Sequence, residues 1–532
     1  MALPDFVVVI LAAGKGTRLR SALAKVLHRA GGQTLVEHVV RACRPLKARA
    51  MVGVVGHQAE QVSAVLEPLG VRTVVQRPQS GTGHALLVAR RAIGRAKFVI
   101  VVPGDAPLVG TETLAALART HRQAHAAATI LSAEVANPAG YGRILRRQDG
   151  SVAAIVEDSA LTDDQRGIAE INASIYAFTL EKLWPYLARV RPANVHREIY
   201  LTDVIALLRE QGETVLAQIA PDADEVLGCN TRADLAEVDQ VFRRRKRAAL
   251  MAAGVTIQTP VETVIVDADV TVGADTTLEP GVQLLGGTRI GGGCTIRTGS
   301  ILSDTTLEDG VLVKPYTVIS GSHLAAGSQT GPFAHLRGPV RLMKGSHVGN
   351  FVEVKKSVIG ERAKAMHLTY LGDTRVGSET NIGAGTITCN YDGVHKHPTV
   401  IGRRVFVGSD AAIVAPVRVG DGAYIAAGSV ITKNVPADAL ALARGRQVNK
   451  PGWATARRRQ MAAAKHSSAK RTVTKHASKK RAAKRAAALP SRKAAGRGHS
   501  RAAQKSSPAR HAALRARSRQ RSSGRRPRKA RT

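Results

Sequence analysis

The chain contains 532 residues, 44% of them hydrophobic, and is therefore long enough to build two or more domains with buried cores. Its four cysteines lie far apart and form no CxxC pair, which argues against a zinc site or a disulfide framework. No apolar stretch approaches the ~18 residues of a membrane-spanning helix, and the first residues lack the basic start and long apolar core of a signal peptide. We expect a reduced, cytoplasmic setting and no membrane span.

Residues 1–232 alternate between continuous apolar runs and amphipathic stretches. The runs FVVVILAA, AMVGVVG, VRTVVQ and FVIVVPGD are typical of strands buried on both faces. Between them lie stretches typical of helices, such as LVEHVVRAC and GTGHALLVARRAI. Alternating strands and helices predict an α/β domain with a mostly parallel, Rossmann-like sheet.

The motif LAAGKGTR (11–18) directly follows the first predicted strand, where ligands bind in open α/β sheets. Gly14 and Gly16 would let the backbone turn its N–H groups toward a phosphate, and Arg18 and Lys25 could neutralise a triphosphate. For a lone motif, an ordinary strand-to-helix turn is the simpler interpretation. Leu19 replaces the third glycine of GxGxxG, which disfavours a dinucleotide fold, and GxxxxGK[ST] is absent, so the motif is not a P-loop.

A helical linker is predicted over 233–255, closed by Gly254, and a six-residue repeat dominates the following domain, 256–453. Neither a helix nor an alternating strand has a period of six, whereas short parallel strands stacked as a solenoid do. The solenoid itself should run to about residue 436. The repeating apolar residues are Val272, Leu278, Leu284, Ile290, Ile296 and Leu302, and later Val407, Ile413, Val419, Ile425 and Ile431.

The last segment, 454–532, holds 27 of the 78 Lys and Arg residues and no Asp or Glu, so it carries most of the net charge of +38. It contains no aromatic residue and repeats Ala, Ser, Lys and Arg, a composition that predicts disorder. A polycation of this kind should bind nucleic acid or another polyanion through phosphate contacts without sequence preference.

Several motifs, taken in order, carry a resemblance to a known family. LAAGKGTR, GTGHA (81–85), PGDAPL (103–108), GYGRI (140–144) and YLTD (200–203) resemble the motifs of sugar-nucleotide pyrophosphorylases. With the hexapeptide solenoid behind them, residues 5–453 resemble the GlmU family, bifunctional N-acetylglucosamine-1-phosphate uridyltransferases and glucosamine-1-phosphate N-acetyltransferases. The resemblance implies a homotrimer whose solenoid is a left-handed parallel β-helix, with sites shared between subunits.

In the first domain, the resemblance implies transfer of UMP from UTP to N-acetylglucosamine-1-phosphate, with Mg²⁺ held by Asp105 and Asn230. Gln76, Gly81 and Thr82 match the uracil-reading positions, and Gly142, Glu157 and Asn172 match the sugar contacts. The full set of implied nucleotide- and sugar-binding residues is Leu11, Ala12, Ala13, Gly14, Arg18, Lys25, Gln76, Gly81, Thr82, Gly104, Asp105, Gly142, Glu157, Asn172 and Asn230.

In the solenoid, the resemblance implies acetylation of glucosamine-1-phosphate by acetyl-CoA, with His367 as general base. Both activities would feed peptidoglycan and lipopolysaccharide precursors. The implied sugar-phosphate contacts are Arg337, Lys355, Tyr370, Asn381, Asn390, Tyr391 and Lys396. The implied acetyl-CoA contacts are Ala384, Ser409, Ala427 and Arg444.

Some positions depart from the family pattern: Ala24 stands in place of a proline, Pro103 in place of an aromatic residue, and Ser174 in place of a glycine. Two alternatives stay open at this point. The chain could be a single-function sugar nucleotidyltransferase with a structural solenoid, or a polyanion-binding protein that carries a degenerate enzyme body.

Overall fold

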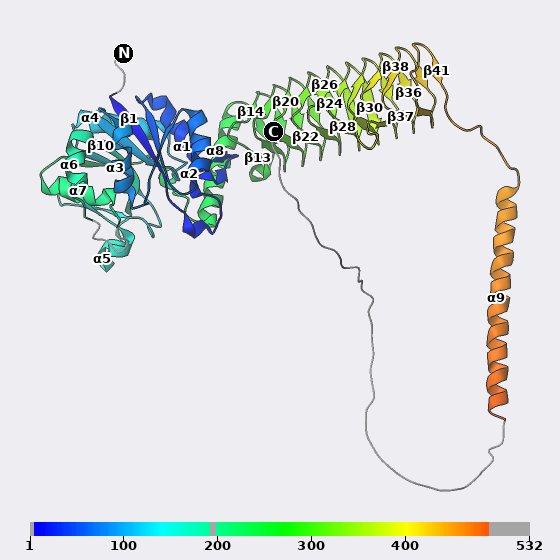
Figure 1. Cartoon of the computed structure of the whole chain (residues 1–532), viewed down its shortest axis with the longest axis horizontal. Helices are drawn as coiled ribbons and strands as arrows, with labels where there is room; N and C mark the ends of the chain where they lie inside the picture. The colour runs from blue at the N-terminus through cyan, green and yellow to red at the C-terminus, as the bar shows by residue number, and fades with distance from the viewer. Residues whose placement is uncertain (1–4, 192–197, 489–532) are drawn as a thin grey trace, which may run out of the picture. The chain divides into compact units, whose positions relative to one another are not determined.

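The computed structural model describes residues 5–191 and 198–488, which divide into two units, 1–445 and 446–532. The larger unit contains an α/β domain followed by a stack of short parallel strands (Figure 1). Among the described residues, no helix is both long enough and apolar enough to span a membrane.

The α/β domain is built on one mixed sheet with the strand order β11-β7-β10-β6-β1-β4-β5, to which β8 and β9 are added beside β10. The pairs β1–β4, β1–β6, β4–β5 and β7–β11 are parallel, and β10 is antiparallel to its neighbours. The strands are β1 (Phe6–Ala12), β4 (Met51–Val55), β5 (Arg72–Val75), β6 (Phe98–Pro103), β7 (Ala128–Glu134), β8 (Arg143–Arg146), β9 (Val152–Val156), β10 (Glu170–Thr179) and β11 (Val215–Ile219), with a hairpin of β2 (Arg29–Ala30) and β3 (Gln33–Thr34) outside the sheet.

Helices cover both faces of this sheet because its central strand is apolar throughout. Phe6, Val8 and Ile10 of β1 share one buried cluster with α1, α2 and α4, whereas Val7 and Val9 share the other with α3, α6 and α7. The predicted parallel-type α/β layout is therefore confirmed. The helices are α1 (Leu35–Cys43), α2 (Ala59–Leu66), α3 (Thr82–Ile93), α4 (Thr111–Gln123), α5 (Asp163–Arg166), α6 (Leu180–Leu187), α7 (Leu201–Glu210) and α8 (Arg232–Ala252).

Helix α8 leads from the α/β domain to the solenoid. Thr231 and Asp234 form a capping box at its start, which satisfies backbone donors that have no partner inside the helix. Along its length, Val238 and Val241 pack against the α/β domain, while Leu250 joins the solenoid core. Lys246 Nζ donates to the Ala268 carbonyl at 2.9 Å, which ties the helix to the first coil.

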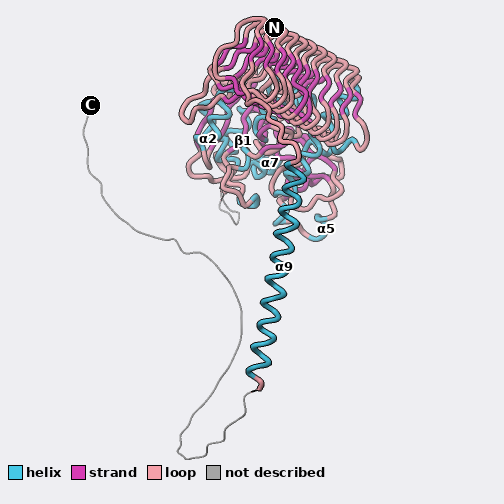
Figure 2. The backbone as a smooth tube through the Cα atoms, turned by 90° about the vertical axis from the view of Figure 1, so that its right-hand side faces the viewer, coloured by secondary structure: helices cyan, strands magenta, loops and turns pink. Residues whose placement is uncertain are grey.

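The solenoid is a parallel β-helix with three sheets, as the six-residue repeat predicts (Figure 2). Each coil contributes one strand per sheet, and its apolar residues form one continuous core. The first sheet contains β12 (Thr256–Ile257), β15 (Thr277–Leu278), β18 (Thr295–Ile296), β21 (Leu312–Val313), β24 (Gln329–Thr330), β27 (His347–Asn350), β30 (Lys364–His367), β33 (Asn381–Ile382), β36 (Phe406–Val407), β39 (Tyr424–Ile425) and β41 (Leu440–Ala441).

The second sheet contains β13 (Ile265–Val266), β16 (Gln283–Leu285), β19 (Ile301–Ser303), β22 (Val318–Ser320), β25 (His335–Arg337), β28 (Glu353–Lys355), β31 (Tyr370–Gly372), β34 (Ile387–Cys389), β37 (Ala412–Val414) and β40 (Val430–Ile431). The third contains β14 (Thr271–Val272), β17 (Arg289–Ile290), β20 (Thr306–Leu307), β23 (His323–Leu324), β26 (Arg341–Leu342), β29 (Val358–Ile359), β32 (Thr374–Val376), β35 (Thr399–Ile401) and β38 (Val417–Val419).

The second unit differs from the predicted disorder. Residues Trp453–Ala486 form a single helix, α9, whose side chains are all exposed. The expectation of disorder rested on the lack of apolar residues, but Ala, Lys and Arg are also among the strongest helix formers, and this stretch contains no Gly or Pro. The remainder of the predicted disordered segment, 489–532, lies outside the described residues.

Candidate active sites

Four of the predicted residues meet at the carboxyl ends of β1 and β6. Asp105 follows β6, and Asn230 lies just before α8. Lys25 forms an ion pair with Asp105 and donates a hydrogen bond from Nζ to Asn230 Oδ1 at 2.6 Å. Arg18 donates from Nη2 to the same oxygen at 2.9 Å. The fold thus brings a carboxylate, an amide oxygen and two cations to one place.

Close backbone approach builds this edge of the sheet. Gly104 donates its N–H to the Leu11 carbonyl at 2.8 Å, and a Cβ at Gly104 would lie 3.1 Å from that oxygen and 3.4 Å from the Ala12 Cβ. Pro103 pairs in register with Leu11 but has no N–H to donate. The Gly104 N–H therefore continues the contact to β1 beyond Pro103.

The glycine-rich loop after β1 presents free backbone donors. Gly16 adopts φ +62°, a conformation that favours glycine. Within the described part of the chain, the N–H groups of Gly14, Lys15 and Gly16 donate no hydrogen bond. These donors, together with Arg18 and Lys25, form a cationic cradle suited to phosphate oxygens.

Gln76 and Gly81 lie side by side, with Gln76 directly after the carboxyl end of β5. The buried Gln76 amide donates from Nε2 to the Gly81 carbonyl at 3.0 Å and contacts His84 Nδ1 at 3.1 Å. Because a carbonyl cannot accept from another carbonyl, Gly81 fixes the orientation of the amide and leaves Gln76 Oε1 facing away as an acceptor. Thr82 Oγ1 accepts from the Leu201 N–H at 3.0 Å, so the YLTD segment supports this corner.

The predicted sugar contacts also come together. The Asn172 N–H donates to the Gly142 carbonyl at 2.8 Å, and the Asn172 side chain donates to Tyr176 Oη at 2.7 Å. Glu157 accepts from Thr202 Oγ1 at 3.1 Å, and burial raises the pKa of its carboxyl group. Ser174, which stands in a family glycine position, adopts φ +58°, so the backbone keeps the left-handed conformation despite the substitution.

The donor set at Asp105 and Asn230 fits a divalent metal. One carboxylate and one amide oxygen are few ligands, but Mg²⁺ is usually held by one or two protein oxygens together with waters and substrate phosphates. The Lys25 ammonium contacts both oxygens, which indicates that this position accepts a cation. The described residues hold no group of three or more His, Cys, Asp or Glu side chains able to bind a metal.

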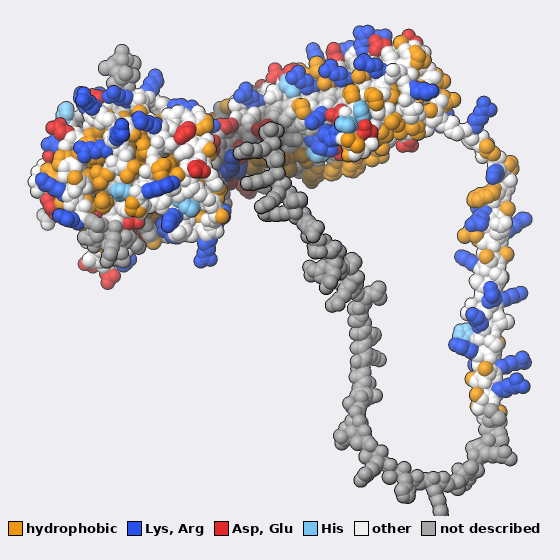
Figure 3. Space-filling view, viewed as in Figure 1, with side chains coloured by type: hydrophobic (Ala, Val, Ile, Leu, Met, Phe, Trp, Pro, Cys, Tyr) orange, Lys and Arg blue, Asp and Glu red, His pale blue; other side chains and the backbone are white. Residues whose placement is uncertain are grey.

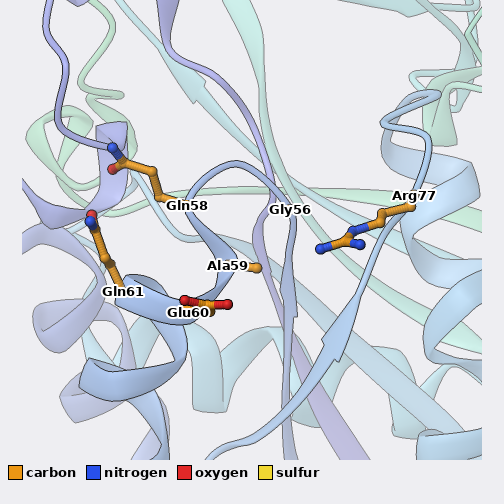
Figure 4. A pocket seen from close by; sticks show the side chains of 6 residues that line it. All are labelled: Gly56, Gln58, Ala59, Glu60, Gln61 and Arg77. Atoms are coloured by element: carbon orange, nitrogen blue, oxygen red, sulfur yellow. The ribbon is translucent and has the colours of Figure 1, made fainter. Parts of the chain in front are cut away.

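A depression of about 280 Å³ opens at the carboxyl end of β4, beside the glycine-rich loop (Figure 4). No residue expected from the sequence lines it. Its polar walls come from the turn after β4, the first turn of α2 and the end of β5. The lining residues are Gly56, Gln58, Ala59, Glu60, Gln61 and Arg77.

In the β-helix, the predicted catalytic and acetyl-CoA residues share one register position. Lys364, Asn381, Phe406 and Tyr424 pair in successive coils of the first sheet. The residue three positions after each of these is a predicted site residue, so four predicted residues occupy the same corner of four consecutive coils. The first of them is an exposed histidine. These four residues are His367, Ala384, Ser409 and Ala427, and we call them the corner column. Arg444 Nη1 donates to the Ala427 carbonyl at 2.9 Å and so adjoins it.

The predicted sugar-phosphate residues gather on the second sheet. Arg337 and Lys355 pair in register, and the neighbouring Lys396 ammonium lowers the pKa of Lys355. Asn390 Nδ2 donates to Asp373 Oδ2 at 2.6 Å. A Cβ at Gly372 would collide with both Tyr370 Oη and Asn390 Nδ2, so this glycine leaves room for the two side chains. Three cations concentrated here suit a phosphate monoester. The group of Arg337, Lys355, Tyr370, Asn390 and Lys396 is called the cationic cluster.

Within the described residues, no hydrogen bond or ion pair joins the corner column to the cationic cluster. Asn381, expected to contact the sugar, lies on the first sheet with the column. Tyr391, also expected there, is exposed and pairs with Lys396 across a short loop. In the described part of one chain, the corner column and the cationic cluster are therefore not linked by a polar contact.

Sequence reasoning missed several residues that support these sites. Tyr141 Oη accepts from the Gly228 N–H at 3.4 Å, close to Asn230, and burial raises the pKa of the Tyr141 hydroxyl. His84 contacts Gln76, and Asp373 holds Asn390. Tyr141 lies in GYGRI, His84 in GTGHA and Asp373 in the segment HLTYLGD (367–373) that begins with His367, so each had a signal in the sequence. Gln58 had no such signal.

Comparisons with known proteins agree with both halves of the chain. A family model for the MobA-like NTP transferase domain matches residues 8–167, and one for the bacterial transferase hexapeptide (six repeats) matches residues 398–433. The chain is 48% identical over 457 residues to the bifunctional protein GlmU of Koribacter versatilis (strain Ellin345), covering 85% of this chain and 97% of that protein.

The bifunctional protein GlmU of Streptomyces coelicolor (strain ATCC BAA-471 / A3(2) / M145) is 47% identical over 467 residues, covering 87% of this chain and 96% of that protein. The chain belongs to the GlmU family. The resemblance drawn from the motifs is thereby confirmed. The matched part of the chain spans nearly the whole length of these relatives.

Proposed function

We propose that this chain makes UDP-N-acetylglucosamine at two sites. The β-helix acetylates glucosamine-1-phosphate with acetyl-CoA, and the α/β domain then joins UMP from UTP to N-acetylglucosamine-1-phosphate, releasing pyrophosphate. The observation that carries the proposal is the meeting of Arg18, Lys25, Asp105 and Asn230 at one sheet edge, in a different domain from the cationic cluster in the solenoid.

The nucleotide would be held along the edge from Gln76 to Lys25. Uracil offers an N3–H donor beside a carbonyl acceptor, which complements the Gln76 Oε1 acceptor and the Gly81 N–H donor. The oriented amide would disfavour cytosine, whose corresponding groups have the opposite polarity. The backbone N–H groups of Gly14–Gly16 and the cations of Arg18 and Lys25 would bind the phosphates, since phosphoryl-type transfer is catalysed mainly by positioning and charge.

Asp105 and Asn230 would hold Mg²⁺, which supplies positive charge to the phosphates when bound. Lys25 must then move its ammonium from Asp105 toward the nucleotide, where it stabilises the charge on the attacked α-phosphate and the departing pyrophosphate. Gly142, Glu157 and Asn172 would orient the sugar so that its phosphate oxygen attacks in line. The new P–O bond forms as the bond to pyrophosphate breaks.

In the β-helix, the amine of glucosamine-1-phosphate would attack the thioester carbonyl carbon of acetyl-CoA. His367 accepts the proton lost by the amine as the C–N bond forms, and CoA leaves with the sulfur when the C–S bond breaks. The corner column gives acetyl-CoA a straight path along the coils toward His367, and the cationic cluster would hold the sugar phosphate.

A homotrimer would complete this second site, because no polar contact within the described residues of one chain links its two halves. Beside the corner column, an apolar ridge of Tyr316, Phe333, Phe351 and Leu368 occupies one corner of four consecutive coils, and the side chains are 47–63% exposed. Their rings stack at 5.3–5.4 Å. A second copy packed on this ridge would bring its cationic cluster toward His367. Sedimentation should give a trimer that Phe351→Glu dissociates, whereas Ile219→Glu, at a site in the α/β domain that is also about half exposed, should not.

The basic tail would bind nucleic acid, and α9 would provide part of the contact. Among its 34 residues, 12 are Lys or Arg (Figure 3). Consecutive residues lie about 100° apart around a helix, so Arg457, Arg458 and Arg459 face three sides. Arg471 and Arg485 face the fourth side, so that α9 has no apolar face for a membrane surface. Binding to a 30-base-pair duplex should fall by roughly 10³-fold or more between 50 and 200 mM salt. Salt-independent binding, or equal binding to neutral vesicles, would contradict this proposal.

One assay tests the enzymatic proposal directly. The full chain, given glucosamine-1-phosphate, acetyl-CoA, UTP and Mg²⁺, should form UDP-N-acetylglucosamine, CoA and pyrophosphate in equal amounts. Omission of acetyl-CoA should stop the reaction, and adding N-acetylglucosamine-1-phosphate should restore it. Formation of UDP-sugar only from the acetylated substrate would favour a single-function nucleotidyltransferase with a structural solenoid, and no product from either would favour a degenerate body.

A further inference from the structure

The turn after β4 forms hydrogen bonds with both ends of the glycine-rich loop, 13–25. At the start of the loop, the His57 N–H donates to the Ala13 carbonyl at 3.1 Å. At the end, the Gln58 amide makes two bonds: Oε1 accepts from the Ala24 N–H at 2.6 Å, and Nε2 donates to the Ala22 carbonyl at 2.6 Å.

The turn that carries Gln58 is itself tightly constrained. Gln58 adopts φ +50° and ψ +44°, a left-handed conformation that is uncommon outside glycine, and it caps α2. A Cβ at Gly56 would lie 2.9 Å from both the Cβ and the carbonyl oxygen of Ala13. Figure 4 places Gln58 on this turn with its amide directed away from Arg77. Such strained positions cluster at functional sites.

Ala24 directly precedes Lys25 and is almost completely buried, and its N–H donates to the Gln58 amide oxygen, so removal of that amide takes away its partner. In the structure, the Lys25 ammonium is held by Asp105 and Asn230. In the proposed uridyltransferase reaction, that ammonium leaves Asp105 for the nucleotide. The backbone there also accepts from the Leu27 and His28 N–H groups, at the Ala24 and Lys25 carbonyls. The two bonds from Gln58 are side-chain contacts that then still fix the backbone before Lys25.

We propose that Gln58 is a positioning residue for Lys25. It holds the backbone of residues 22–24 in place while the Lys25 side chain exchanges Asp105 for the phosphates of the nucleotide. The inference rests on the proposed uridyltransferase activity and goes beyond it, because the Gln58 amide is occupied by the backbone of Ala22 and Ala24 and is not one of the groups assigned to substrate or metal. Its function would be confined to the first site and would leave the acetyltransferase reaction unchanged.

The test uses the full chain and a pair of matched variants. Gln58→Ala removes both amide bonds, and Gln61→Ala is the control, because Gln61 lines the same depression on the same helix but is exposed. We expect Gln58→Ala to lower kcat/KM for UTP about tenfold, with the KM for N-acetylglucosamine-1-phosphate and the acetyltransferase rate within twofold of wild type. Gln61→Ala should leave both rates within twofold.

A rescue variant separates positioning from general stability. Ala24 has φ −55°, which suits proline. Ala24→Pro alone should be damaging, since the ring would occupy the place of the Gln58 amide. Combined with Gln58→Ala, however, the proline leaves no unpaired N–H and stiffens the loop, so the double variant should recover to within about threefold of wild type. Gln58→Asn, which keeps the amide but is one methylene shorter, provides a milder variant if Gln58→Ala folds poorly.

The possible failures are distinguishable. If the wild-type chain transfers no uridylyl group, the proposed function is wrong. If the wild type is active and both Gln58 variants keep its rate, the inference about Gln58 is wrong. Equal losses at both sites, or a double variant no better than Gln58→Ala, would reduce Gln58 to a structural residue.

Discussion

The two folded regions of unit 1 build their sites in opposite ways. In the α/β domain, residues from distant parts of the chain converge on one sheet edge: Arg18 and Lys25 from the first loop meet Asp105 and Asn230. In the β-helix, the corner column repeats one register position in successive coils. A convergent site depends on the whole domain, whereas a repeated site depends on local stacking. A substitution in the α/β-domain site should therefore abolish one activity and leave the other, and a substitution in the β-helix site should do the reverse.

The largest expected effect lies in the β-helix. His367→Ala should lower acetyltransferase kcat by roughly 10²–10⁴, the usual contribution of a positioned acid–base group, with acetyl-CoA affinity and uridyltransferase rate unchanged. Single-turnover kinetics with glucosamine-1-phosphate would measure it. His323→Ala, in an earlier coil, is the control and should keep the wild-type rate. A wild-type rate in His367→Ala would leave His367 as a structural residue of the coil corner.

A substitution in the α/β domain should have the converse effect, a loss of uridyltransferase activity alone. Asp105→Ala should lower uridyltransferase kcat by about 10²–10³, the cost of removing a main source of charge stabilisation, at any practical Mg²⁺ concentration. The acetyltransferase rate should stay within twofold, because the two sites lie on different architectures. Pyrophosphate release measures the first activity and CoA release the second. Retention of more than a tenth of the uridyltransferase activity would count against Asp105 as the metal ligand.

The sequence predicted the β-helix well because its signal is local. A six-residue repeat needs only neighbouring residues to be recognised, and the coils pair with steps of 17 or 18 residues over most of their length. The longest step is 25 residues, as from Asn381 to Phe406. That extra length carries Asn390, Tyr391 and Lys396. The interruption of the repeat therefore coincides with three of the residues that the family resemblance assigns to the sugar-phosphate site.

The convergent site was predictable only through the family resemblance. No spacing rule joins Asp105 to Asn230, because 125 residues separate them and the contact depends on how β6 and α8 meet. Gln58 was missed because a glutamine in a turn is ordinary, and its importance lies in a backbone conformation that the sequence does not display. Helix α9 was missed because low hydrophobicity was weighed above the helix propensity of Ala, Lys and Arg.

A further difference concerns what each core buries. The α/β domain buries the titratable His121, whereas the β-helix corners bury Ser and Thr hydroxyls. Burial lowers the pKa of His121 to about 4 from 6.5. As the pH falls from 6.5, His121 binds a proton in the unfolded chain but not in the folded chain, and this proton uptake stabilises the unfolded state. The contribution of neutral, buried His121 to stability is therefore full above pH 6.5 and is lost as the pH falls toward 4. The difference between these two pKa values corresponds to a loss of at most about 3 kcal/mol in the free energy of unfolding.

Differential scanning calorimetry between pH 7 and 4 would check this. The thermal transition of the α/β domain should move down with acidification more steeply than that of the β-helix. His121→Gln should flatten the slope of the first transition, while His125→Gln, at an exposed neighbouring position, should leave it unchanged. Equal slopes in the wild type and His121→Gln would show that His121 is not the titrating group.

The smallest expected effect tests whether the basic tail belongs to either site. Deleting 454–532 removes 27 positive charges and no acidic residue, so DNA binding at low salt should disappear. Both reaction rates should stay within about twofold, because the corner column ends at Ala427 and its neighbour Arg444 precedes the cut by ten residues. The retained residues, 1–453, still carry 51 basic and 40 acidic residues. The control is therefore a measurement of how much DNA this truncated body binds by itself. A large loss of acetyltransferase rate on deletion would instead mean that the tail contributes to the acetyl-CoA site, and the boundary between enzyme and tail would have to move.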